Sequence, residues 1–405
     1  MKPIVRARRM KPVHSDIRGP LFVEAMKRQK QGIDILKLNT GNPATFGFGL
    51  PDSIKNALME HMQDGVGYCD FKGMPQARQA ICDYETSKGI KGITSDDVFI
   101  GNGVSEVVSF ALTPLLNDGD EVLVPSPSYS LWGNSVYLED GKPVFYTCDE
   151  QANWYPDIKD IRSKITDKTK AIVIINPNNP TGVLYPKELL LEIIQIAREF
   201  GLLILADEIY DRLVMDGKQH ISLASLTEDV PVITLNGLSK SHCLCGYRCG
   251  WMVISGPREL TEDYRQGIIQ LTSLRLCANT LAQIVIPAAL DDMETPASMV
   301  RPGGRIYEQR EATVRELEKI DGLSFVKNDA AFYVFPKLDV KKFNITNDKQ
   351  FAHDLLDVTN ILLVPGSGFD WKDPDHFRIV MLPQADILSD AIRRMGTFLD
   401  GYKQK

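Results

Sequence analysis

Between residues 47 and 290, short apolar runs alternate with amphipathic stretches of helical length, and this alternation constrains the fold more than any other feature. The runs are apolar throughout rather than alternately apolar and polar, as expected for strands buried on both faces of a sheet. Such strands, separated by helices, indicate a parallel sheet and therefore an α/β domain. The clearest runs lie in DDVFIGNG, DEVLVPSPSY, AIVIINPNNPTG, GLLILADEIYD and PVITLNGLSK.

The pattern changes on either side of this region. After it, a charged helical stretch, GGRIYEQREATVRELEKI, is followed by LSFVKNDAAFYVFPKL, another helical stretch and the strand-like HFRIVMLP, which together predict a smaller α+β domain. The first 46 residues carry too little apolar pattern to fold alone, and we expect them to form an arm that docks on this domain. We therefore predict an N-terminal arm and part of the small domain at 1–46, a large domain at 47–290 and a C-terminal small domain at 291–405.

Charge, apolar run length and cysteine distribution argue against several classes of protein. The formal net charge is −7, and no basic stripe with interleaved aromatics suggests nucleic-acid binding. No apolar run approaches the ~20 residues of a membrane span, and the basic start MKPIVRARRMK lacks the apolar core of a secretory signal. The 7 cysteines are scattered, so we expect reduced thiols and a cytoplasmic location.

In the α/β region, nearly every apolar run ends in a polar or Gly/Pro-rich segment. These segments are GNGVSE, PSPSY, NPNNPTG, ADEIYD and NGLSK. Open parallel sheets bind ligands at the carboxyl ends of their strands, so these segments are expected to meet at one crevice. The sequence therefore predicts a single large ligand site.

Each of these strand ends also allows a purely structural interpretation. Asp207 directly follows an apolar run, where a carboxylate either caps a helix or awaits a cationic ligand. The glycines of GNGVSE either form a turn or open a helix whose free N–H groups bind phosphate. NPNNPTG is either a tight loop or part of the site, and its Asn179–Pro180 bond is a candidate cis peptide.

The segment NGLSKSHCLCGYRCGWM, residues 236–252, combines a lysine with an arginine. Lys240 follows a strand and a turn, and burial or nearby cations would make it lose its proton easily and attack aldehydes. Arg248 offers a permanently charged fork suited to phosphate. With a carboxylate, a tyrosine, amides and a phosphate-type helix start, these groups match the needs of pyridoxal 5'-phosphate (PLP).

The same segment has an alternative reading as a metal site. Structural zinc sites favour pairs spaced C-x₂₋₄-C, and the chain has no second pair of that kind elsewhere. The C-x-C spacing is also cramped, so we predict no metal and treat the cysteines as small buried hydrophobes. The four potential zinc ligands are His242, Cys243, Cys245 and Cys249.

Four motifs in a fixed order resemble the fold-type I PLP-dependent aminotransferases of the aspartate aminotransferase superfamily. They are NPNNPTG, ADEIYD, SK followed by GYRCG, and a late FRIV, and the resemblance runs from about residue 15 to the C-terminus. Within the superfamily, IRGP, LNTGNP, GYCDFKG and INPNNPTG resemble the branch that includes the alanine (glutamate–pyruvate) aminotransferases. The resemblance implies a mostly parallel seven-stranded sheet flanked by helices in the large domain, beside the smaller α+β domain.

The resemblance also implies a role for each motif residue toward PLP. Lys240 would bind PLP covalently and later carry the proton of the substrate Cα, while Asp207 would pair with the pyridine nitrogen. Tyr210 and Asn179 would hydrogen-bond the phenolate oxygen, and Tyr129 would stack on the ring. The residues implied to hold the phosphate are Gly103, Val104 through its backbone N–H, Ser105, Ser239 and Arg248.

Two further motifs carry implied contacts to the substrate and to a second subunit. Arg378, in HFRIV, resembles the arginine that clamps the substrate α-carboxylate, helped by Asn179 and the backbone of Gly41. Tyr68, in GYCDFKG, resembles a tyrosine that reaches the phosphate of the neighbouring subunit. The resemblance therefore implies a homodimer with composite active sites.

The chain departs from the family pattern after SK, where the family usually has small or aliphatic residues. Here Cys243 and Cys249 occupy those positions. Because thiols beside the predicted phosphate site could be oxidised, we hypothesise that oxidation weakens cofactor binding.

The implied function is PLP-dependent transamination in which L-alanine and 2-oxoglutarate give pyruvate and L-glutamate. Two alternatives stay open on the same fold, namely an aminotransferase of aromatic, branched-chain or aspartate donors and a PLP-dependent C–S β-lyase. A ligand-sensing regulator would need a DNA-binding domain, which we do not expect in the short segment before LNTGNP. No motif selects alanine, since selectivity depends on the pocket lining and on how the segment with Ile17 and Arg18 covers it.

Overall fold

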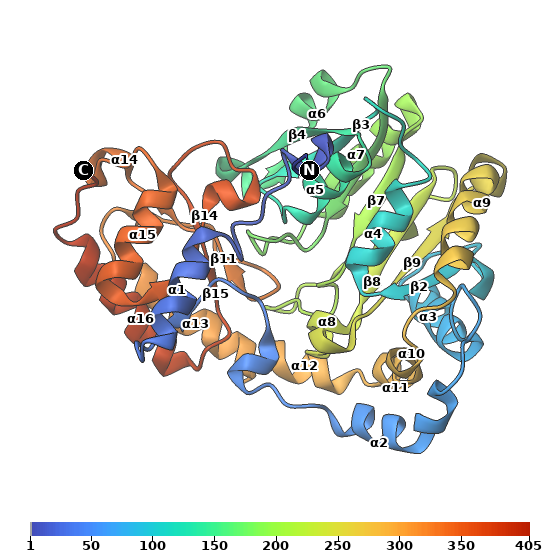
Figure 1. The fold of residues 1–405 in the computed structure, drawn as a ribbon, viewed down its shortest axis with the longest axis horizontal. Coiled ribbons are helices and arrows are strands. Elements are labelled where there is room, and N and C mark those ends of the chain that lie inside the picture. The colour runs from blue at the N-terminus through green and yellow to red at the C-terminus, as the bar shows by residue number, and fades with distance from the viewer. Residues whose placement is uncertain (1) are drawn as a thin grey trace.

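The computed structural model describes residues 2–405 and is built around one eight-stranded sheet (Figure 1). From one edge to the other, the strand order is β2-β9-β8-β7-β6-β3-β4-β5. The strands are β2 (Val98–Asn102), β3 (Glu121–Ser126), β4 (Lys142–Asp149), β5 (Tyr155–Pro156), β6 (Thr169–Ile175), β7 (Leu203–Asp207), β8 (Val232–Gly237) and β9 (Cys249–Ser255).

The central strands of this sheet are parallel. β4, β3, β6, β7 and β8 pair in parallel along the sheet, whereas β9 is antiparallel to both β8 and β2. The mostly parallel α/β sheet expected from the sequence is therefore confirmed. The seven strands implied by the resemblance are those of five residues or more, and the two-residue β5 extends the edge beyond β4.

Helices cover both faces of the sheet, which explains why its strands are apolar throughout. Ile172 and Ile174 of β6 pack into one buried cluster with α7, and Val173 and Ile175 pack into another with α4 and α9. The helices of this region are α2 (Asp52–His61), α3 (Pro75–Ser87), α4 (Val104–Leu112), α5 (Leu131–Leu138), α6 (Ile158–Lys164), α7 (Lys187–Phe200), α8 (Leu238–Ser241), α9 (Arg258–Arg275), α10 (Thr280–Ile284), α11 (Ile286–Asp291) and α12 (Glu294–Val300).

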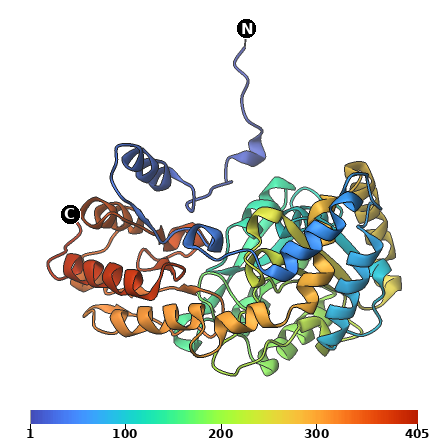
Figure 2. The ribbon, with the colours of Figure 1, turned by 90° about the horizontal axis from the view of Figure 1, so that it is seen from below.

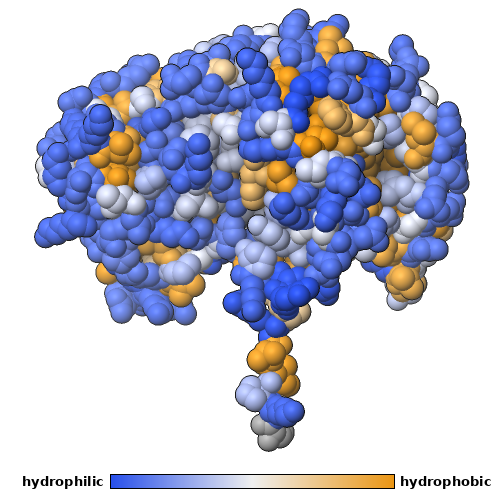
Figure 3. All heavy atoms as spheres, turned by 90° about the horizontal axis from the view of Figure 1, so that it is seen from above, coloured by the Kyte–Doolittle hydropathy of each residue, from blue (hydrophilic) through white to orange (hydrophobic). Residues whose placement is uncertain are grey.

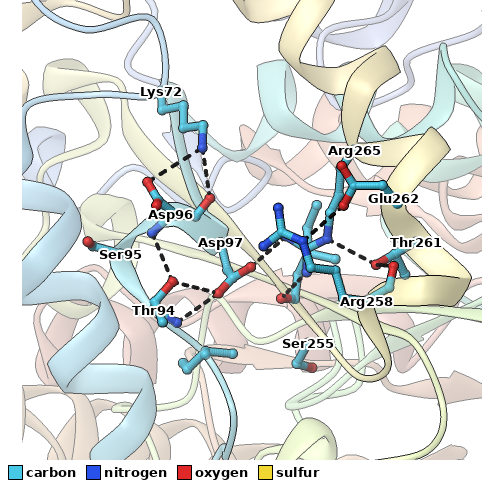
Figure 4. A network of polar contacts seen from close by, with 12 residues as sticks. Lys72, Thr94, Ser95, Asp96, Asp97, Ser255, Arg258, Thr261, Glu262 and Arg265 are labelled. Atoms are coloured by element: carbon cyan, nitrogen blue, oxygen red, sulfur yellow. Dashed lines mark hydrogen bonds and ion pairs between the residues drawn. The ribbon is translucent and has the colours of Figure 1, made fainter.

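A polar network fastens the edge strand β2 to helix α9 (Figure 4). Thr94 and Asp97 form a capping box just before β2. Asp97 Oδ2 accepts a hydrogen bond from the Thr94 N–H, and Thr94 Oγ1 accepts one from the Asp96 N–H. The other oxygen of Asp97 accepts a hydrogen bond from Arg265 at 2.6 Å, and Arg265 also donates to the Ile254 carbonyl. The network thus joins the turn before β2, the helix α9 and the strand β9.

Removing Arg265 is expected to destabilise the chain strongly. Its side chain is 6% exposed and that of Asp97 is 8%, so Arg265→Met leaves a buried carboxylate without its cation. Such a loss costs about 3–5 kcal/mol of unfolding free energy. Arg258→Met is the matched control on the same helix, because its ion pair with Glu262 is exposed and contributes less than about 1 kcal/mol. Urea unfolding curves check both values; equal midpoints for the two variants would contradict the prediction.

The last part of the chain forms a second layer of helices around short strands, to the left in Figure 1. A separate buried cluster that includes Leu317, Phe351, Leu355 and Ile379 forms its core. Its elements are α13 (Arg305–Leu317), β10 (Leu323–Ser324), β11 (Tyr333–Val334), β12 (Lys337–Leu338), α14 (Val340–Phe343), α15 (Asp348–Thr359), β13 (Ile361–Leu362), β14 (Val364–Pro365), β15 (Phe377–Val380) and α16 (Ala385–Leu399). We keep the bounds 1–46, 47–290 and 291–405 as a proposal for the domains.

The N-terminal segment lies against this second core before it crosses to the large sheet. Helix α1 (Pro20–Lys30) packs against α15, and β1 (Leu36–Lys37) pairs in parallel with β13. Further toward the N-terminus, Arg8–Met10 form a short 3-10 helix that packs against α5, and the residues before it extend from the body of the molecule (Figure 2). Ile4 and Val5 in this extension are exposed. The face seen in Figure 3 is largely hydrophilic. Within residues 2–405, no helix has the length and apolar character needed to span a bilayer.

Candidate active site

A cavity of about 880 Å³ lies at the carboxyl ends of the parallel strands, as the polar strand ends predict. Residues from the N-terminal segment, the large sheet and the second core line it together. The residues predicted from the sequence that line it are Gly41, Val104, Ser105, Tyr129, Asn179, Asp207, Tyr210, Ser239, Lys240, Arg248 and Arg378. Gly103 lies directly behind Arg248, whereas Tyr68 lies outside the cavity.

Lys240 extends into the cavity from the short helix α8, which directly follows β8. Its Nζ donates a hydrogen bond to the Gly41 carbonyl at 2.9 Å and lies 3.8 Å from Cys245 Sγ. Burial lowers the pKa of Lys240, but Tyr333, Cys245 and Tyr129 outweigh burial and hold this pKa above its ordinary value. The expectation that Lys240 loses its proton easily is therefore wrong, because the effects of Tyr333, Cys245 and Tyr129 outweigh those of burial and of the Arg378 cation.

Asp207 is the last residue of β7 and is 4% exposed. Its Oδ2 accepts from Trp132 Nε1 at 3.1 Å and its Oδ1 from the Ile209 N–H at 3.3 Å. Burial raises the pKa of Asp207 to about 6, and these two hydrogen bonds lower it in part. The chain forms turns at 209–212, so Asp207 caps no helix there. Lys240 lowers the pKa of the Asp207 carboxyl through its charge but, like every other cation of residues 2–405, forms no ion pair with it. The site thus offers a buried anion to a ligand.

The opposite end of the cavity has the shape of an anion cradle. Gly103 precedes helix α4 with φ of 86°, which favours glycine, and the first N–H groups of this helix have no intrahelical partner. A Cβ at Gly103 would lie 2.3 Å from the Arg248 guanidinium, so a side chain here would displace the arginine. Arg248 is held by a hydrogen bond from Nη1 to the Cys245 carbonyl at 2.9 Å. Glycine is therefore required where helix and arginine converge.

Arg378 is a buried cation without a counter-charge. It lies on β15, is 1% exposed, and its guanidinium carbon is 4.6 Å from the ring centroids of both Tyr333 and Phe369. Nη1 donates to Asn179 Oδ1 at 2.9 Å and Nη2 donates to the Asn39 carbonyl, whereas Nε has no partner. An arginine held open in this way is suited to bind an organic carboxylate.

The NPNNPTG loop belongs to the site and is also tightly ordered. Its Asn179–Pro180 bond is cis, as predicted, and Asn176–Pro177 is cis as well. Asn179 is 5% exposed and lines the cavity with the side chain that holds Arg378.

Sequence reasoning missed two aromatic residues at the site. Trp132 was passed over although it lies three positions after Tyr129 in PSPSYSLW, and it forms the only side-chain hydrogen bond to Asp207 within the described chain. Tyr333, in the apolar run AAFYVF, lines the cavity and places its hydroxyl 2.9 Å from that of Tyr210. The tryptophan follows the PSPSY strand end at helical spacing, which is the one signal that could have found it.

The structure separates the four potential zinc ligands. His242 bonds to Ser241 and to the Asp292 carbonyl, and Cys249 lies in the core of β9. Burial raises the pKa of both Cys243 and Cys249 to about 12, so these thiols stay protonated. Only Cys245 of this segment's thiols lines the cavity.

The oxidation hypothesis, made for Cys243 and Cys249, therefore shifts to Cys245, the thiol of this segment that lines the cavity. Mild peroxide treatment is expected to convert its thiol to a sulfenic acid beside Lys240 and to lower PLP retention several-fold. Cys245→Ala protein should keep its PLP, while Cys243→Ala, which removes a buried thiol of the same segment, should behave like the unaltered chain. Bound PLP is measured before and after treatment, and equal losses in all three proteins would refute the hypothesis.

Comparison with known proteins agrees with this geometry. Residues 33–392 match the model of the family Aminotransferase class I and II. The chain is 50% identical over 404 residues to the glutamate-pyruvate aminotransferase AlaA of Haemophilus influenzae, with 100% of each chain covered. It matches the crystal structure of an aminotransferase from Escherichia coli with a TM-score of 0.98, at 47% identity and with 100% of each chain covered. An alanine aminotransferase from Pyrococcus furiosus matches with a TM-score of 0.93 at 40% identity, over 98% of this chain and 100% of that one.

These relatives cover 98–100% of the chain, and their sequence identities of 40–50% are far above those of proteins that share only a fold. They confirm the resemblance to fold-type I aminotransferases and the α/β fold class inferred from the sequence. The chain therefore belongs to the class I and II aminotransferase family.

Proposed function

We propose that the chain is a PLP-dependent transaminase that moves the amino group of L-alanine to 2-oxoglutarate, giving pyruvate and L-glutamate. One observation carries the proposal: a single cavity contains a lysine, a buried carboxylate, a phosphate-type cradle and an arginine without a counter-charge. The names of the relatives support alanine as the donor, since that of Haemophilus influenzae is a glutamate-pyruvate aminotransferase and that of Mycobacterium tuberculosis, 45% identical, an alanine aminotransferase.

The residues present fit PLP. Asp207 offers a buried anion for the ring nitrogen, and the Arg248 guanidinium fills the space that a side chain at Gly103 would take. Burial raises the pKa of Tyr210, so its hydroxyl keeps its proton and can donate to the phenolate oxygen together with Asn179. We assign Tyr129, which lines the same cavity, to stack on the ring. We assign the phosphate to Gly103, Val104, Ser105, Ser239 and Arg248.

The chain's own side chains divide the work of transamination among them. Arg378 binds the α-carboxylate and thereby orients the substrate Cα toward Lys240. Lys240 Nζ takes the proton from this carbon and later returns it, as general base and general acid. Asp207 stabilises the proton on the ring nitrogen. Bound PLP supplies the electron sink that accepts the electrons left when the Cα proton departs.

We also propose that the chain acts as a homodimer in the cytoplasm. Tyr68 is 84% exposed, does not line its own cavity and borders a hollow together with 277–280. Val66, two positions before Tyr68, is apolar and exposed, and so are Leu274 and Leu276, which precede the 277–280 segment; exposed apolar residues are common at protein interfaces. In a dimer, Tyr68 would then reach the partner's phosphate. All cysteines of the described chain are free thiols, which suits a reducing compartment.

A panel of amino donors with 2-oxoglutarate as acceptor tests the substrate assignment. L-Alanine is expected to have the highest kcat/KM. A negligible rate with alanine beside a fast aromatic, branched-chain or aspartate donor would overturn it. Ammonia release from a cysteine thioether without transamination would instead identify a C–S β-lyase.

Arg18 is expected to bind the second carboxylate of 2-oxoglutarate, which alanine lacks. It lines the same cavity as Arg378 and forms no ion pair within residues 2–405. Arg18→Gln should raise the KM for 2-oxoglutarate by up to about fivefold, because an exposed ion pair contributes up to about 1 kcal/mol, and should leave the KM for alanine unchanged. Arg9→Gln is the control, because Arg9 pairs with Asp140 outside the cavity. A shift of both KM values together would contradict this role.

A further inference from the structure

Trp132 donates a hydrogen bond to Asp207, the carboxylate assigned to the ring nitrogen of PLP, yet it belongs to none of the sequence motifs that predicted the site. It lies in the first turn of α5 and is completely buried, in the cluster formed by strands β3, β6 and β7 with the helices above them. A tryptophan in such a place normally packs as an apolar residue and needs one partner for its N–H. Here that partner is Asp207 Oδ2, at 3.1 Å.

This hydrogen bond helps to orient the Asp207 carboxylate but leaves it able to accept further hydrogen bonds. The Ile209 N–H occupies Oδ1 and the Trp132 N–H occupies Oδ2, and each oxygen accepts one bond. Since an ionised carboxylate has about four acceptor positions, both oxygens can still accept a donor from the cavity. The two donors therefore fix the plane of the carboxylate while its cavity side stays free.

Trp132 also links two contacts to the same ligand. Tyr129 precedes it by three residues, lines the cavity and is the residue assigned to stack on the ring. The short segment 129–132 thus contains both the tyrosine assigned to stack on the PLP ring and the tryptophan that donates to the Asp207 carboxylate. A shift of this segment would disturb both contacts together.

We infer that Trp132 is a positioning residue that holds the Asp207 carboxylate in place and in its anionic form, so that the shared proton stays on the PLP ring nitrogen. This inference rests on the proposed function. Burial raises the pKa of Asp207 to about 6, and the Trp132 hydrogen bond is the largest influence that opposes burial. Without the indole N–H, the carboxylate is more basic and competes better for the proton. The ring nitrogen of PLP is then less often protonated, and the ring accepts the electrons from the substrate Cα less well.

The chain offers a matched control for the loss of such a bond. Trp251 is 1% exposed, and its Nε1 donates to the buried Glu85 carboxylate at the same distance of 3.1 Å. It does not line the cavity. Trp251→Phe therefore removes an equally buried indole–carboxylate bond from the same protein without touching Asp207.

The test compares the protonation of the ring nitrogen in reconstituted proteins, using PLP labelled with ¹⁵N at that atom and solid-state NMR near neutral pH. Trp132→Phe is expected to move the ¹⁵N shift toward the value of an unprotonated pyridine and to weaken PLP binding by about tenfold, the effect of one hydrogen bond to a charged group. Trp251→Phe should leave the ¹⁵N shift and the PLP affinity unchanged, even where it lowers stability.

A second variant separates the N–H from the volume of the ring. Replacing Trp132 with 3-benzothienylalanine keeps the bicyclic shape and exchanges the N–H for sulfur, so the core stays filled. The expected shift of the ¹⁵N signal matches that of Trp132→Phe. A wild-type ¹⁵N shift in this protein would overturn the inference, whatever the Phe variant does. Failure of the unaltered chain to bind PLP, or an unprotonated ring nitrogen in it, would instead overturn the cofactor assignment itself.

Discussion

Lys240→Ala protein is expected to lose its covalent link to PLP and at least about 10⁴-fold in kcat with L-alanine, because one residue supplies both the nucleophile and the acid–base group. Lys240 is the only lysine that lines the cavity in the described chain, so no second amine can replace it. The measurement combines the visible absorbance of the purified protein with the PLP that stays attached after borohydride reduction and denaturation.

Lys240→Arg is the matched variant for this prediction. Its guanidinium keeps a positive charge and can still donate to the Gly41 carbonyl, but it does not react with aldehydes. Both variants should therefore lack the visible band, while the arginine variant keeps more of the stability of the native contact. PLP that stayed covalently attached in the alanine variant would refute the assignment of Lys240.

The residues found from the sequence share one property, namely their place directly after an apolar strand. Asp207 is the last residue of β7 and Lys240 lies three residues after the end of β8, so the sheet itself sets the position of these side chains. Alternation of apolar and helical runs predicts a parallel sheet, and a parallel sheet brings its carboxyl ends together. For these residues, the local sequence pattern therefore suffices to predict their position in the folded chain. Arg378, on a strand of four residues, came only from the resemblance.

The residues and properties that were missed depend on contacts between distant parts of the chain. Trp132 and Asp207 are 75 positions apart, and Tyr210 and Tyr333 are 123 apart. Nothing in an apolar run tells which of its members meets a polar atom. The direction of the pKa shift of Lys240 was mispredicted for the same reason, since burial lowers this pKa but Tyr333 and Cys245, which lie elsewhere in the chain or across a turn, contribute to raising it.

The fold shows the same limit in its smaller part. The large sheet could be predicted because seven of its eight strands have five to eight residues, whereas the strands of the second core have two to four residues, too few to show a hydrophobic periodicity. Helix α1 buries only Ala25 completely and depends on α15 for its place, as the weak apolar pattern of the N-terminal segment indicated.

Arg378→Lys is expected to lower kcat/KM for L-alanine by about 10³-fold. The arginine can give a carboxylate two charge-assisted hydrogen bonds of about 1.5–3 kcal/mol each, and a lysine ammonium cannot span the same geometry. It also cannot maintain the contacts with the Asn179 side chain and the Asn39 carbonyl at the same time. The visible absorbance of bound PLP should stay unchanged, since Arg378 is assigned to the substrate and not to the cofactor.

Ethylamine, which is alanine without its carboxylate, distinguishes this role of Arg378 from general damage to the site. If Arg378 acts only through the carboxylate, its replacement leaves the slow reaction with ethylamine unchanged, and the preference for alanine over ethylamine falls by the same ~10³-fold factor. If the buried arginine instead supports the packing of Tyr333 and Phe369, both substrates lose rate together and the preference stays constant. The ratio of the two rates therefore measures the carboxylate contact by itself, because any loss of folded or PLP-loaded protein affects both rates equally.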